Sequence, residues 1–469
     1  MNSLNDEQQT VKKAIETMQR GDRLVVSGRA GSGKTYAITN SVAERTALFL
    51  TPTHPARTVL DQELGDKRHI VATIHSAIGW FRKKNDDLLW VDGYLPAYEA
   101  RRRQKQATDL KSCPFSKADI IIVDEFSMVG SFLFEAVEEY AKEFDLPVVY
   151  SGDRFQLPPV GDREVIMDQG FETITMDGSM RFSKDSEIFR LGEVLRERIE
   201  TKQNGSVPYL HGDADVQVVS GTDWITELRQ GYKKGDSLLA VTSDNATLKR
   251  LRGSVRGVEH DQLIEGDHVT SKQTDDLFRN GEQFTVAKAE RHMRVLEDVP
   301  TCVSRFNTLQ LDGFAITFAE GNREAFILKD DKQGEKHAMR IRSLYKKGDL
   351  NRDQAARILD WLEQTNSFEL SALATVHKSQ GRSLDTVYVD TATVLERSAW
   401  LSEKDHLRSL YTAITRARKR VVFYEMRAHC ASALPVPEQV QLLGPVEVIS
   451  TGGTDHAHSQ GGDRLAQAS

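Results

Sequence analysis

Short runs of apolar residues recur along the first third of the chain, separated by turns and polar stretches. The runs are Leu24–Val26, Leu48–Leu50, Ile120–Val123 and Val148–Tyr150. Near-continuous apolar strands of this kind are typical of parallel sheets that are buried on both faces. Helical patterns lie between them, for example over Asp6–Arg20 and Phe132–Phe144. The alternation predicts an α/β fold with a doubly wound parallel sheet.

The same alternation returns in the second half of the chain. Further strands are predicted over Leu238–Val241, Val387–Val389 and Val421–Tyr424. The chain has 469 residues, several times the roughly 100–200 residues of one domain. We therefore expect two α/β domains.

Two segments interrupt this pattern and are interpreted as insertions. Residues 77–117 are polar, with scattered aromatic residues and the basic run Arg101–Lys105, which we interpret as a solvated helix face rather than a dedicated site. Residues 263–370 contain the turn signal Asn280-Gly281 and short β-like pieces at Gln283–Val286 and Ala325–Leu328. From about Pro435 the chain is rich in Pro, Gly, Ser, His and Gln, which predicts a disordered tail.

Composition excludes several classes of protein. Hydrophobic residues make up 39% and charged residues 28%, as in soluble globular proteins. No apolar run reaches the roughly 18 residues that span a bilayer, and no secretory segment follows Met1, so we expect a cytoplasmic protein without a membrane partner. The three cysteines are far apart, which argues against a disulfide framework or a cysteine zinc site. The net charge of −7 means that any nucleic acid must bind in a local groove.

A phosphate-binding loop follows the first strand. Residues 28–35 fit G-x-x-x-x-G-K-[ST] and should bind ATP through Gly28, Ala30, Gly31, Ser32, Gly33, Lys34 and Thr35. The glycines let backbone N–H groups converge on phosphate oxygens at the start of a helix. Lys34 would reach the β- and γ-phosphates, and the Thr35 hydroxyl would bind Mg²⁺.

The acidic partner of such a loop is expected at the end of another strand. Ile120–Val123 is followed directly by Asp124 and Glu125. Asp124 would hold the metal ion, and Glu125 would orient and deprotonate the attacking water.

The remaining motifs resemble those of superfamily 1 helicases. Motifs Q, Ia, Ib, III, V and VI are similar to Leu4–Gln8, Thr51–His54, Thr73–Ser76, Gly152–Val160, Thr375–Gly381 and Tyr411–Arg418. Together they resemble the RecD/Dda-like branch, which moves 5′→3′ on single-stranded DNA, with Dda-type phage helicases as the nearest match. The order holds from Leu4 to about Tyr424.

The resemblance implies two RecA-like domains that clamp ATP between them, with two insertions. The first domain would cover residues 1–160, including a pin insertion at 77–117. The second would cover 161–262 and 371–434, with an SH3-like insertion at 263–370 and a disordered tail at 435–469.

The resemblance also implies roles for residues at the nucleotide. Gln8 would recognise adenine through its amide, and Gln156 would sense the γ-phosphate. Arg416 would cross from the second domain as a finger that stabilises the transition state. Arg181 would be a second phosphate-contacting arginine, and Gly381, beside Gln380, would lie near the γ-phosphate.

The resemblance also implies a set of DNA-binding residues, namely Pro52, Thr53, His54, His75, His377 and Lys378. His75 and His377 could instead be core or capping histidines. In the pin, Asp92-Gly93 predicts a hairpin turn flanked by Trp90 and Tyr94. Trp90 would stack on the base exposed at the fork, or alternatively pack the insertion against the first domain.

One departure from the family pattern follows Leu238–Val241, where Thr242-Ser243-Asp244 replaces the usual Thr-Asn pair. Residues 330–365 could not be aligned with the family. The sequence predicts an ATP- and Mg²⁺-dependent DNA helicase that acts as a monomer on single-stranded DNA and the duplex fork, alongside replication, repair or recombination proteins. The alternatives are an RNA helicase of the same superfamily and a DNA-stimulated ATPase that remodels or loads proteins without unwinding.

Overall fold

A computed structural model describes most of the chain up to Glu425. The described residues are 4–42, 44–65, 68–106, 113–178, 185–201, 215–258, 262–275, 277–321, 323–395 and 401–425. The predicted tail and Arg181 lie outside them. No helix of these residues is long and apolar enough to cross a membrane.

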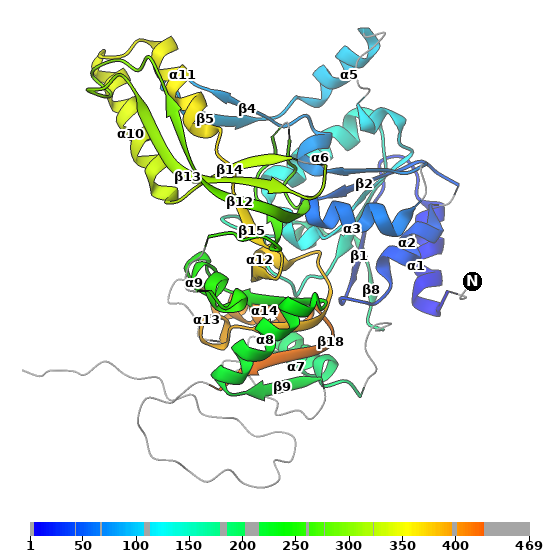
Figure 1. The fold of residues 1–469 in the computed structure, drawn as a ribbon. Helices are drawn as coiled ribbons and strands as arrows, with labels where there is room; N and C mark the ends of the chain where they lie inside the picture. Colours follow the sequence, from blue (N-terminus) through cyan, green and yellow to red (C-terminus); the bar gives the residue numbers. More distant parts are fainter. Residues whose placement is uncertain are drawn as a thin grey trace, which may run out of the picture.

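The first domain is built on a six-stranded parallel sheet of order β3-β2-β6-β7-β1-β8 (Figure 1). Its strands are β1 Arg23–Gly28, β2 Ala47–Thr51, β3 Ile70–Thr73, β6 Ile120–Val123, β7 Val148–Gly152 and β8 Glu172–Met176. Its helices and 3-10 turns are α1 Asp6–Thr17, α2 Lys34–Ser41, α3 His54–Leu64, α4 Ile74–Ala77, α6 Ser131–Phe144, η1 Pro114–Lys117, η2 Phe126–Met128 and η3 Ile166–Gln169. Helices α1, α2 and α3 pack on one face of the sheet and α4 and α6 on the other. The four apolar runs predicted to be strands in this part of the chain are confirmed as buried strands.

The predicted boundary at residue 160 is wrong for this sheet. Strand β8 pairs in parallel with β1, with Leu24 opposite Glu172, so the first domain continues to Met176. β8 is an edge strand in which only Met176 is buried, so it lacks the continuous apolar run that marks the central strands. In addition, Phe155 and Leu157, which follow β7, belong to the core of the second domain.

The second domain holds a five-stranded parallel sheet of order β16-β10-β17-β18-β9. Its strands are β9 Val216–Val219, β10 Leu238–Thr242, β16 Leu373–Thr375, β17 Leu384–Val389 and β18 Ala417–Tyr424. Its helices are α7 Glu187–Thr201, α8 Gly221–Lys234, α9 Asn245–Arg256, α12 Val376–Ser379, α13 Thr391–Leu395 and α14 Glu403–Ile414. Helices α7 and α14 pack on one face and α8 and α9 on the other. The three strands predicted in this domain are confirmed.

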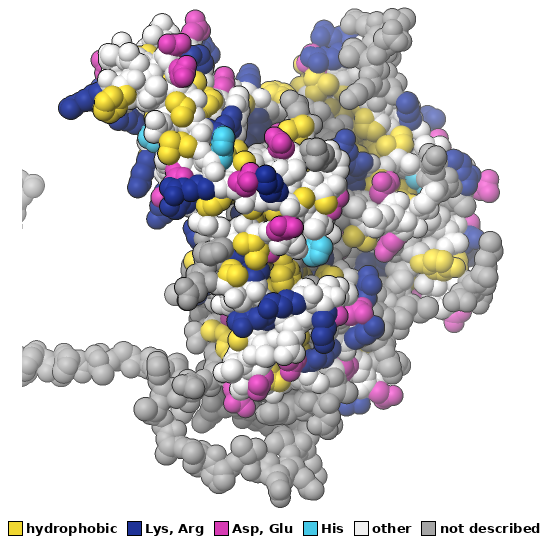
Figure 2. All heavy atoms as spheres, viewed as in Figure 1, with side chains coloured by type: hydrophobic (Ala, Val, Ile, Leu, Met, Phe, Trp, Pro, Cys, Tyr) yellow, Lys and Arg dark blue, Asp and Glu magenta, His cyan; other side chains and the backbone are white. Residues whose placement is uncertain are grey.

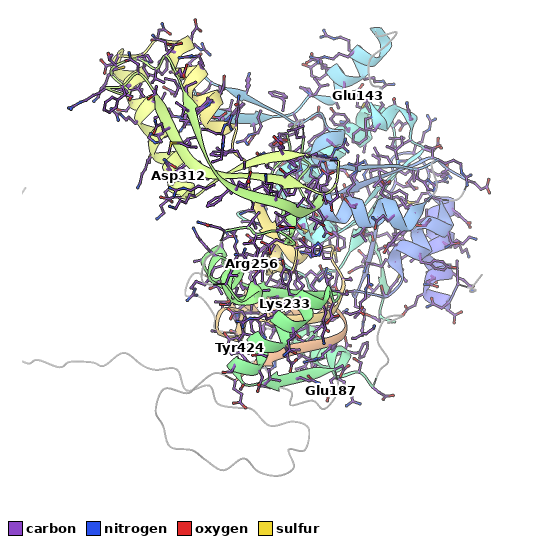
Figure 3. All side chains as sticks on the ribbon, in the orientation of Figure 1. Glu143, Glu187, Lys233, Arg256, Asp312 and Tyr424 are labelled. Carbon is purple, nitrogen blue, oxygen red and sulfur yellow. The ribbon has the colours of Figure 1, made fainter. Side chains whose placement is uncertain are left out.

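The large insertion forms an antiparallel sheet of order β14-β13-β12-β11-β15 and a pair of helices. The elements are β11 His268–Ser271, β12 Gln283–Leu296, β13 Leu309–Phe318, β14 Glu324–Leu328, α10 Asp331–Lys347, α11 Arg352–Glu363 and β15 Phe368–Leu370. Near its base, Arg256 at the end of α9 (labelled in Figure 3) binds Asp267 at 2.9 Å, and both side chains are buried. The far half of β12 and β13 packs against α10 and α11 and projects from the molecule as an outer lobe, residues 289–363 (Figure 1).

The small insertion is a two-stranded hairpin, β4 Phe81–Lys84 and β5 Trp90–Gly93, followed by helix α5 Ala97–Gln106. The predicted turn at Asp92-Gly93 is wrong, because both residues lie in β5 and face Arg82 and Phe81 on β4. The chain turns instead at residues 85–89, where the Asn85 side chain accepts the Leu89 N–H and Leu88 adopts φ 57°. Within the hairpin, Asp92 forms an ion pair with Arg82 at 2.9 Å.

Candidate nucleotide site and nucleic-acid interface

The loop between β1 and α2 forms a concave backbone surface suited to phosphate. Gly31 and Gly33 have φ of 78° and 84°, a region that glycine enters without strain. A Cβ added to Gly28 would come within 2.7 Å of the Met176 carbonyl oxygen, so this position has no room for a side chain. The Ser32 hydroxyl is buried and has no hydrogen-bond partner among the described residues. A buried donor without a partner in a turn of this shape fits a phosphate oxygen.

Lys34 begins α2 and turns back over this loop. Its Nζ donates to the carbonyl oxygens of Gly28 at 2.7 Å and Arg29 at 3.0 Å. Burial lowers the pKa of Lys34, while the nearby carboxylates of Asp153, Glu125 and Asp124 act in the opposite direction. The amine therefore lies at the phosphate-binding loop, where the charge of a phosphate group would also favour its protonated form.

Asp124 and Glu125 directly follow β6, at the carboxyl end of the sheet. The Asp124 N–H donates to Leu50 O at 2.8 Å, which fixes the end of the strand, and Glu125 has a left-handed backbone with φ 56°. Burial raises the pKa of both carboxyl groups, and Asp124 further raises that of Glu125. Carboxylate and hydroxyl oxygens are hard ligands suited to Mg²⁺. Asp124 and Thr35 thus offer the oxygen donors that the predicted Mg²⁺ would need, and when bound the ion would neutralise phosphate charge.

Arg416, at the end of α14, approaches this site from the second domain. It is 3% exposed, and its Nε donates to Thr412 O at 3.1 Å. Burial lowers the pKa of Arg416, and the carboxylate of Glu125 is the strongest opposing influence. The predicted finger and the predicted general base therefore lie within electrostatic reach across the interface between the two domains.

Two buried glutamines lie between the domains, each 2% exposed. Gln380 Nε2 donates to Leu157 O at 3.3 Å. The amide oxygens of Gln156 and Gln380 have no hydrogen-bond partner among the described residues. Gly381, with φ 75°, packs so closely on Ala56 of α3 that a Cβ would come within 2.9 Å. The structure thus brings the predicted Gln156 and Gly381 to the domain interface.

The loop after β7 is joined to α14 by contacts that the sequence did not single out. Tyr411 Oη donates to Asp153 Oδ2 at 2.7 Å, and the Leu157 N–H donates to Thr412 Oγ1 at 3.1 Å. Both bonds are buried and join the first domain's strand to the second domain's helix. The sequence signals were that Asp153 and Leu157 fall within the stretch similar to motif III, and Tyr411 and Thr412 within the stretch similar to motif VI.

The predicted nucleic-acid residues lie at equivalent places in the two domains. The edge strands β3 and β16 are each followed by a four-residue helix capped by threonine, Thr73 and Thr375, and each helix carries a histidine, His75 and His377. The neighbouring strands β2 and β10 also match, because Thr51 and Thr242 donate to the carbonyl two residues later at 3.0 and 2.9 Å. Asp244 caps α9 as Thr53 caps α3. The departure from the family pattern at residues 242–244 therefore preserves the local backbone arrangement.

The histidines of these edges are partly buried. Burial is the largest cause that lowers the pKa of His54, His75 and His377. The His75 ring also makes an edge contact with Trp80, with centroids 4.9 Å apart. Neutral imidazoles bind nucleic acid through hydrogen bonds and ring contacts rather than through charge, so on the second domain's edge the exposed Lys378 is the predicted source of positive charge.

Family comparisons agree with this two-part site. Residues 3–219 match the family described as AAA domain, and residues 370–424 match the UvrD-like helicase C-terminal domain. The first match contains the phosphate-binding loop, and the second contains Arg416. The chain therefore combines an AAA domain with a UvrD-like helicase C-terminal domain. It is accordingly an ATP-hydrolysing enzyme.

Whole-chain comparisons find proteins of low sequence identity to this chain. An uncharacterised protein of Acanthamoeba polyphaga mimivirus is 21% identical, covering 89% of this chain and 98% of the relative. Among solved structures, a Pif1 helicase from Bacteroides in complex with ADP-AlF3 and ssDNA is 16% identical, with 93% and 95% of the chains covered and a TM-score of 0.49. Pif1 helicase from Candida albicans is also 16% identical, with 91% and 96% covered and a TM-score of 0.43.

Gln8 has a structural role in the helicase that the sequence did not reveal. Its Oε1 accepts the Asn5 N–H at 3.1 Å, and Asn5 Oδ1 accepts the Gln8 N–H, which together cap α1. Adenine recognition by Gln8 stays a prediction, and its amide nitrogen and the second lone pair of its oxygen are not used by this cap.

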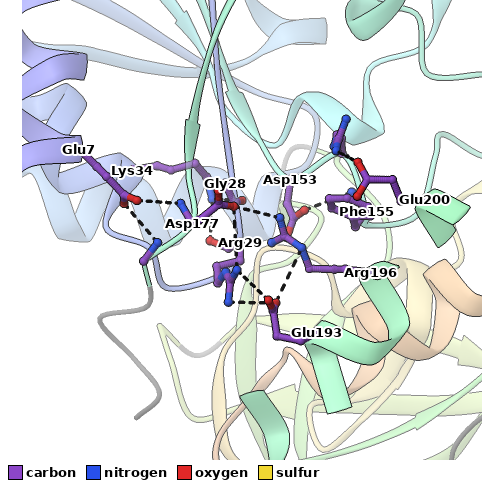
Figure 4. A network of polar contacts seen from close by, with 12 residues as sticks. Glu7, Gly28, Arg29, Lys34, Asp153, Phe155, Asp177, Glu193, Arg196 and Glu200 are labelled. Atoms are coloured by element: carbon purple, nitrogen blue, oxygen red, sulfur yellow. Dashed lines mark hydrogen bonds and ion pairs between the residues drawn. The ribbon is translucent and has the colours of Figure 1, made fainter. Parts of the chain in front are cut away.

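A second group of polar contacts, which the sequence did not predict, joins the phosphate loop to α7 (Figure 4). Arg29 Nη1 pairs with Glu193 Oε1 at 2.9 Å, and its guanidinium lies 4.7 Å from the Phe189 ring centroid. Arg196 pairs with Asp177, which follows β8, at 3.5 Å. Arg29 occupies one of the variable positions of the loop motif, so the motif gave no reason to single it out.

Trp90 lies apart from the other predicted nucleic-acid residues. It is 41% exposed, and its ring lies 4.9 Å from Lys84 Nζ, which also pairs with Asp360 and Glu363 of α11. Tyr94, which was predicted to flank the turn, lies instead at the base of the hairpin, where its hydroxyl donates to Glu139 at 3.0 Å. The hairpin therefore rests on the outer lobe, and the alternative that Trp90 packs against the first domain is wrong.

Proposed function

We propose that this protein is an ATP-dependent DNA helicase that moves 5′→3′ on single-stranded DNA as a monomer and separates duplex DNA at a fork. The observation that carries the proposal is the position of Arg416. It is buried at the domain interface within electrostatic reach of Glu125, while Lys34 lies on the phosphate loop. Its alignment at the γ-phosphate would therefore depend on how the two domains are held together.

Coupling to movement would follow from the bonds between the domains. Tyr411 and Asp153 connect α14 to the strand that leads from the nucleotide site, and the matched edges at His75 and His377 belong to different domains. If hydrolysis changes the angle between the domains, the spacing of the two edges changes with it. Alternating grip on a strand by two such edges produces translocation.

The preference for DNA and the 5′→3′ direction rest on the resemblance to the RecD/Dda-like branch. A Dda-type assignment, the finer form of this proposal, rests on the order of the motifs from Leu4 to about Tyr424. Grip on backbone phosphates and stacked bases would make binding independent of sequence.

One set of assays tests the proposal. ATP hydrolysis is measured without nucleic acid, with single-stranded DNA and with RNA of the same sequence, beside unwinding of duplexes with 5′ or 3′ tails. We expect stimulation by DNA and unwinding from the 5′ tail. Stimulation by RNA alone would favour an RNA helicase, and stimulated hydrolysis without strand separation would favour a remodelling ATPase. Unwinding only from 3′ tails would contradict the branch assignment.

A further inference from the structure

One loop of the outer lobe holds an aromatic ring out in solvent. Phe306, between β12 and β13, is 85% exposed. The loop is nevertheless well bonded, because Val299 N donates to Asn307 O at 2.9 Å and Asn307 N donates to Ser304 O at 3.3 Å. Val299 and Val303 anchor it in the core of the lobe. The ring is therefore presented by an ordered support and does not hang from a loose loop.

Helix α10, beside this loop, has a basic outer face. The helix contains six basic and two acidic residues, Lys332, Lys336, Arg340, Arg342, Lys346 and Lys347 against Asp331 and Glu335. Lys332, Lys336 and Lys347 are exposed, and no described acidic side chain lies within ion-pair distance of them. Figure 2 shows Lys and Arg side chains along the outer edge of this lobe, with hydrophobic side chains among them. For a chain of net charge −7, this is a local concentration of positive charge.

The ring and the basic face are parts of one surface. Arg340 Nη2 donates to Cys302 O at 3.2 Å, which ties α10 to the loop that carries Phe306. Met339, 61% exposed, lies on the same side of the helix. Lysines spaced along a helix match a row of phosphates, and an exposed ring offers a stacking surface for an unpaired base. A duplex has no unpaired base to stack, so the combination favours a single strand.

The same lobe receives the tip of the hairpin. Leu88 is buried in the core of the lobe, Tyr345 Oη of α10 donates to Asp86 O at 3.1 Å, and Lys346 pairs with Asp87 at 3.9 Å. If the hairpin separates the strands, as the proposed function requires, one strand continues between the domains and the other leaves past this lobe. We propose that the outer face of α10 together with Phe306 binds the displaced single strand. This inference rests on the proposed DNA helicase function.

The test compares two substrates that share the same 5′ tail and duplex. One also has an unpaired 3′ tail on the displaced strand, so the difference in affinity reports binding of that strand. Fluorescence anisotropy at several salt concentrations, with a non-hydrolysable ATP analogue, compares the wild-type protein with Phe306→Ala and with Lys332→Ala/Lys336→Ala. The matched control is Lys233→Ala/Lys234→Ala on α8, which is distant from the lobe (Figures 1 and 3).

We expect the wild-type protein and the α8 control to bind the forked substrate more tightly than the 5′-tailed one. Phe306→Ala should weaken fork binding by about fivefold or more, as loss of one stacked base does. The double lysine variant should reduce the slope of log affinity against log salt by about 0.7 per lost phosphate contact. ATP hydrolysis stimulated by single-stranded DNA and the melting temperature should stay unchanged in all variants.

Equal affinity of the wild-type protein for the two substrates would overturn the inference, as would unchanged fork binding in both outer-lobe variants. If fork binding is unchanged but Phe306→Ala abolishes association with another protein, the surface is a protein-binding site instead. Failure of the wild-type protein to bind any single-stranded DNA would contradict the proposed function itself, which is a distinguishable result.

Discussion

Trp90 of the hairpin donates its indole N–H to Glu363 of α11 at 3.0 Å. The two residues are 273 positions apart in the sequence and belong to the two different insertions. Since β4 and β5 extend from the first domain and α11 belongs to the insertion of the second, the contact bridges both domains away from the nucleotide site. The orientation of the hairpin is therefore set by the outer lobe as well as by its own base.

Replacement of Trp90 should separate hydrolysis from unwinding. Trp90→Ala removes both the hydrogen bond and the ring against which Lys84 lies, so we expect unwinding to fall several-fold while DNA-stimulated hydrolysis stays near the wild-type rate. Trp90→Phe keeps an aromatic face and should retain more unwinding. Parallel stopped-flow unwinding and ATPase assays measure both rates. An equal fall of hydrolysis and unwinding would show that Trp90 stabilises the fold instead.

Leu88 at the hairpin tip offers an independent test of docking. Its side chain is 2% exposed in the core of the outer lobe, and removal of a buried leucine side chain typically costs about 2–5 kcal/mol. Leu88→Ala should therefore release the tip, and hydrogen exchange of residues 81–93 should increase without change in the strands of the first domain. Leu88→Met, which preserves apolar volume, is the control. Unaltered exchange in Leu88→Ala would mean that the polar contacts of Lys84, Asp86 and Trp90 with the outer lobe suffice to hold the hairpin.

The sequence predicted the two parallel sheets because their central strands are continuous apolar runs, as at Ile120–Val123. The sequence-based prediction failed where a local pattern indicated one structure but contacts with other residues determined another. Asp92-Gly93 is a common turn pair, yet both residues pair with β4 and the turn lies at residues 85–89, where the Asn85 side chain accepts the Leu89 N–H. Helices α10 and α11 were not predicted, since residues 330–365 matched no helicase motif.

The nucleotide site was predictable because its residues lie in contiguous motifs. The Lys34 loop and the Asp124-Glu125 pair each follow a strand, and parallel strands bring such ends together at one edge of the sheet. Contacts between motifs were not predictable from spacing. The Tyr411–Asp153 bond and the Arg29–Glu193 pair join segments more than a hundred residues apart, and only the folded chain places them together.

Substitutions in the phosphate loop and after β6 should stop hydrolysis in different ways. Lys34→Ala removes the charge that would face the β- and γ-phosphates, so both nucleotide affinity and turnover should fall. Glu125→Gln keeps the shape of the side chain but cannot accept a proton, so it should bind Mg-ATP and turn over very slowly. Equilibrium binding of a fluorescent ATP analogue and single-turnover hydrolysis distinguish the two. Hydrolysis by either variant near the wild-type rate would contradict the assignment.

Arg416→Ala should lower kcat much more than nucleotide affinity. A finger acts on charge that develops in the transition state, and comparable arginines contribute roughly 10³–10⁵ in rate. Arg418, which is exposed two residues later, provides a matched control, and Arg418→Ala should keep most of the rate. Steady-state kinetics and analogue binding test both variants. A large loss of binding with unchanged kcat in Arg416→Ala would exclude a role in the transition state.

The Arg29–Glu193 pair should contribute to the coupling between the phosphate loop and the second domain. The Arg29 carbonyl accepts a bond from Lys34, and its guanidinium contacts both Glu193 and Phe189 of α7, so one residue connects the catalytic lysine to the opposite domain. Arg29→Ala and Glu193→Ala should each reduce DNA-stimulated kcat several-fold. The double variant should be no worse than Arg29→Ala, because the two substitutions remove the same contact. Such non-additivity corresponds to an interaction energy of roughly 0.5–3 kcal/mol.

Arg29→Lys, which keeps the charge, should recover part of the rate. If the reductions in kcat of the two single variants multiply in the double variant, each residue acts independently. Other contacts would then hold α7.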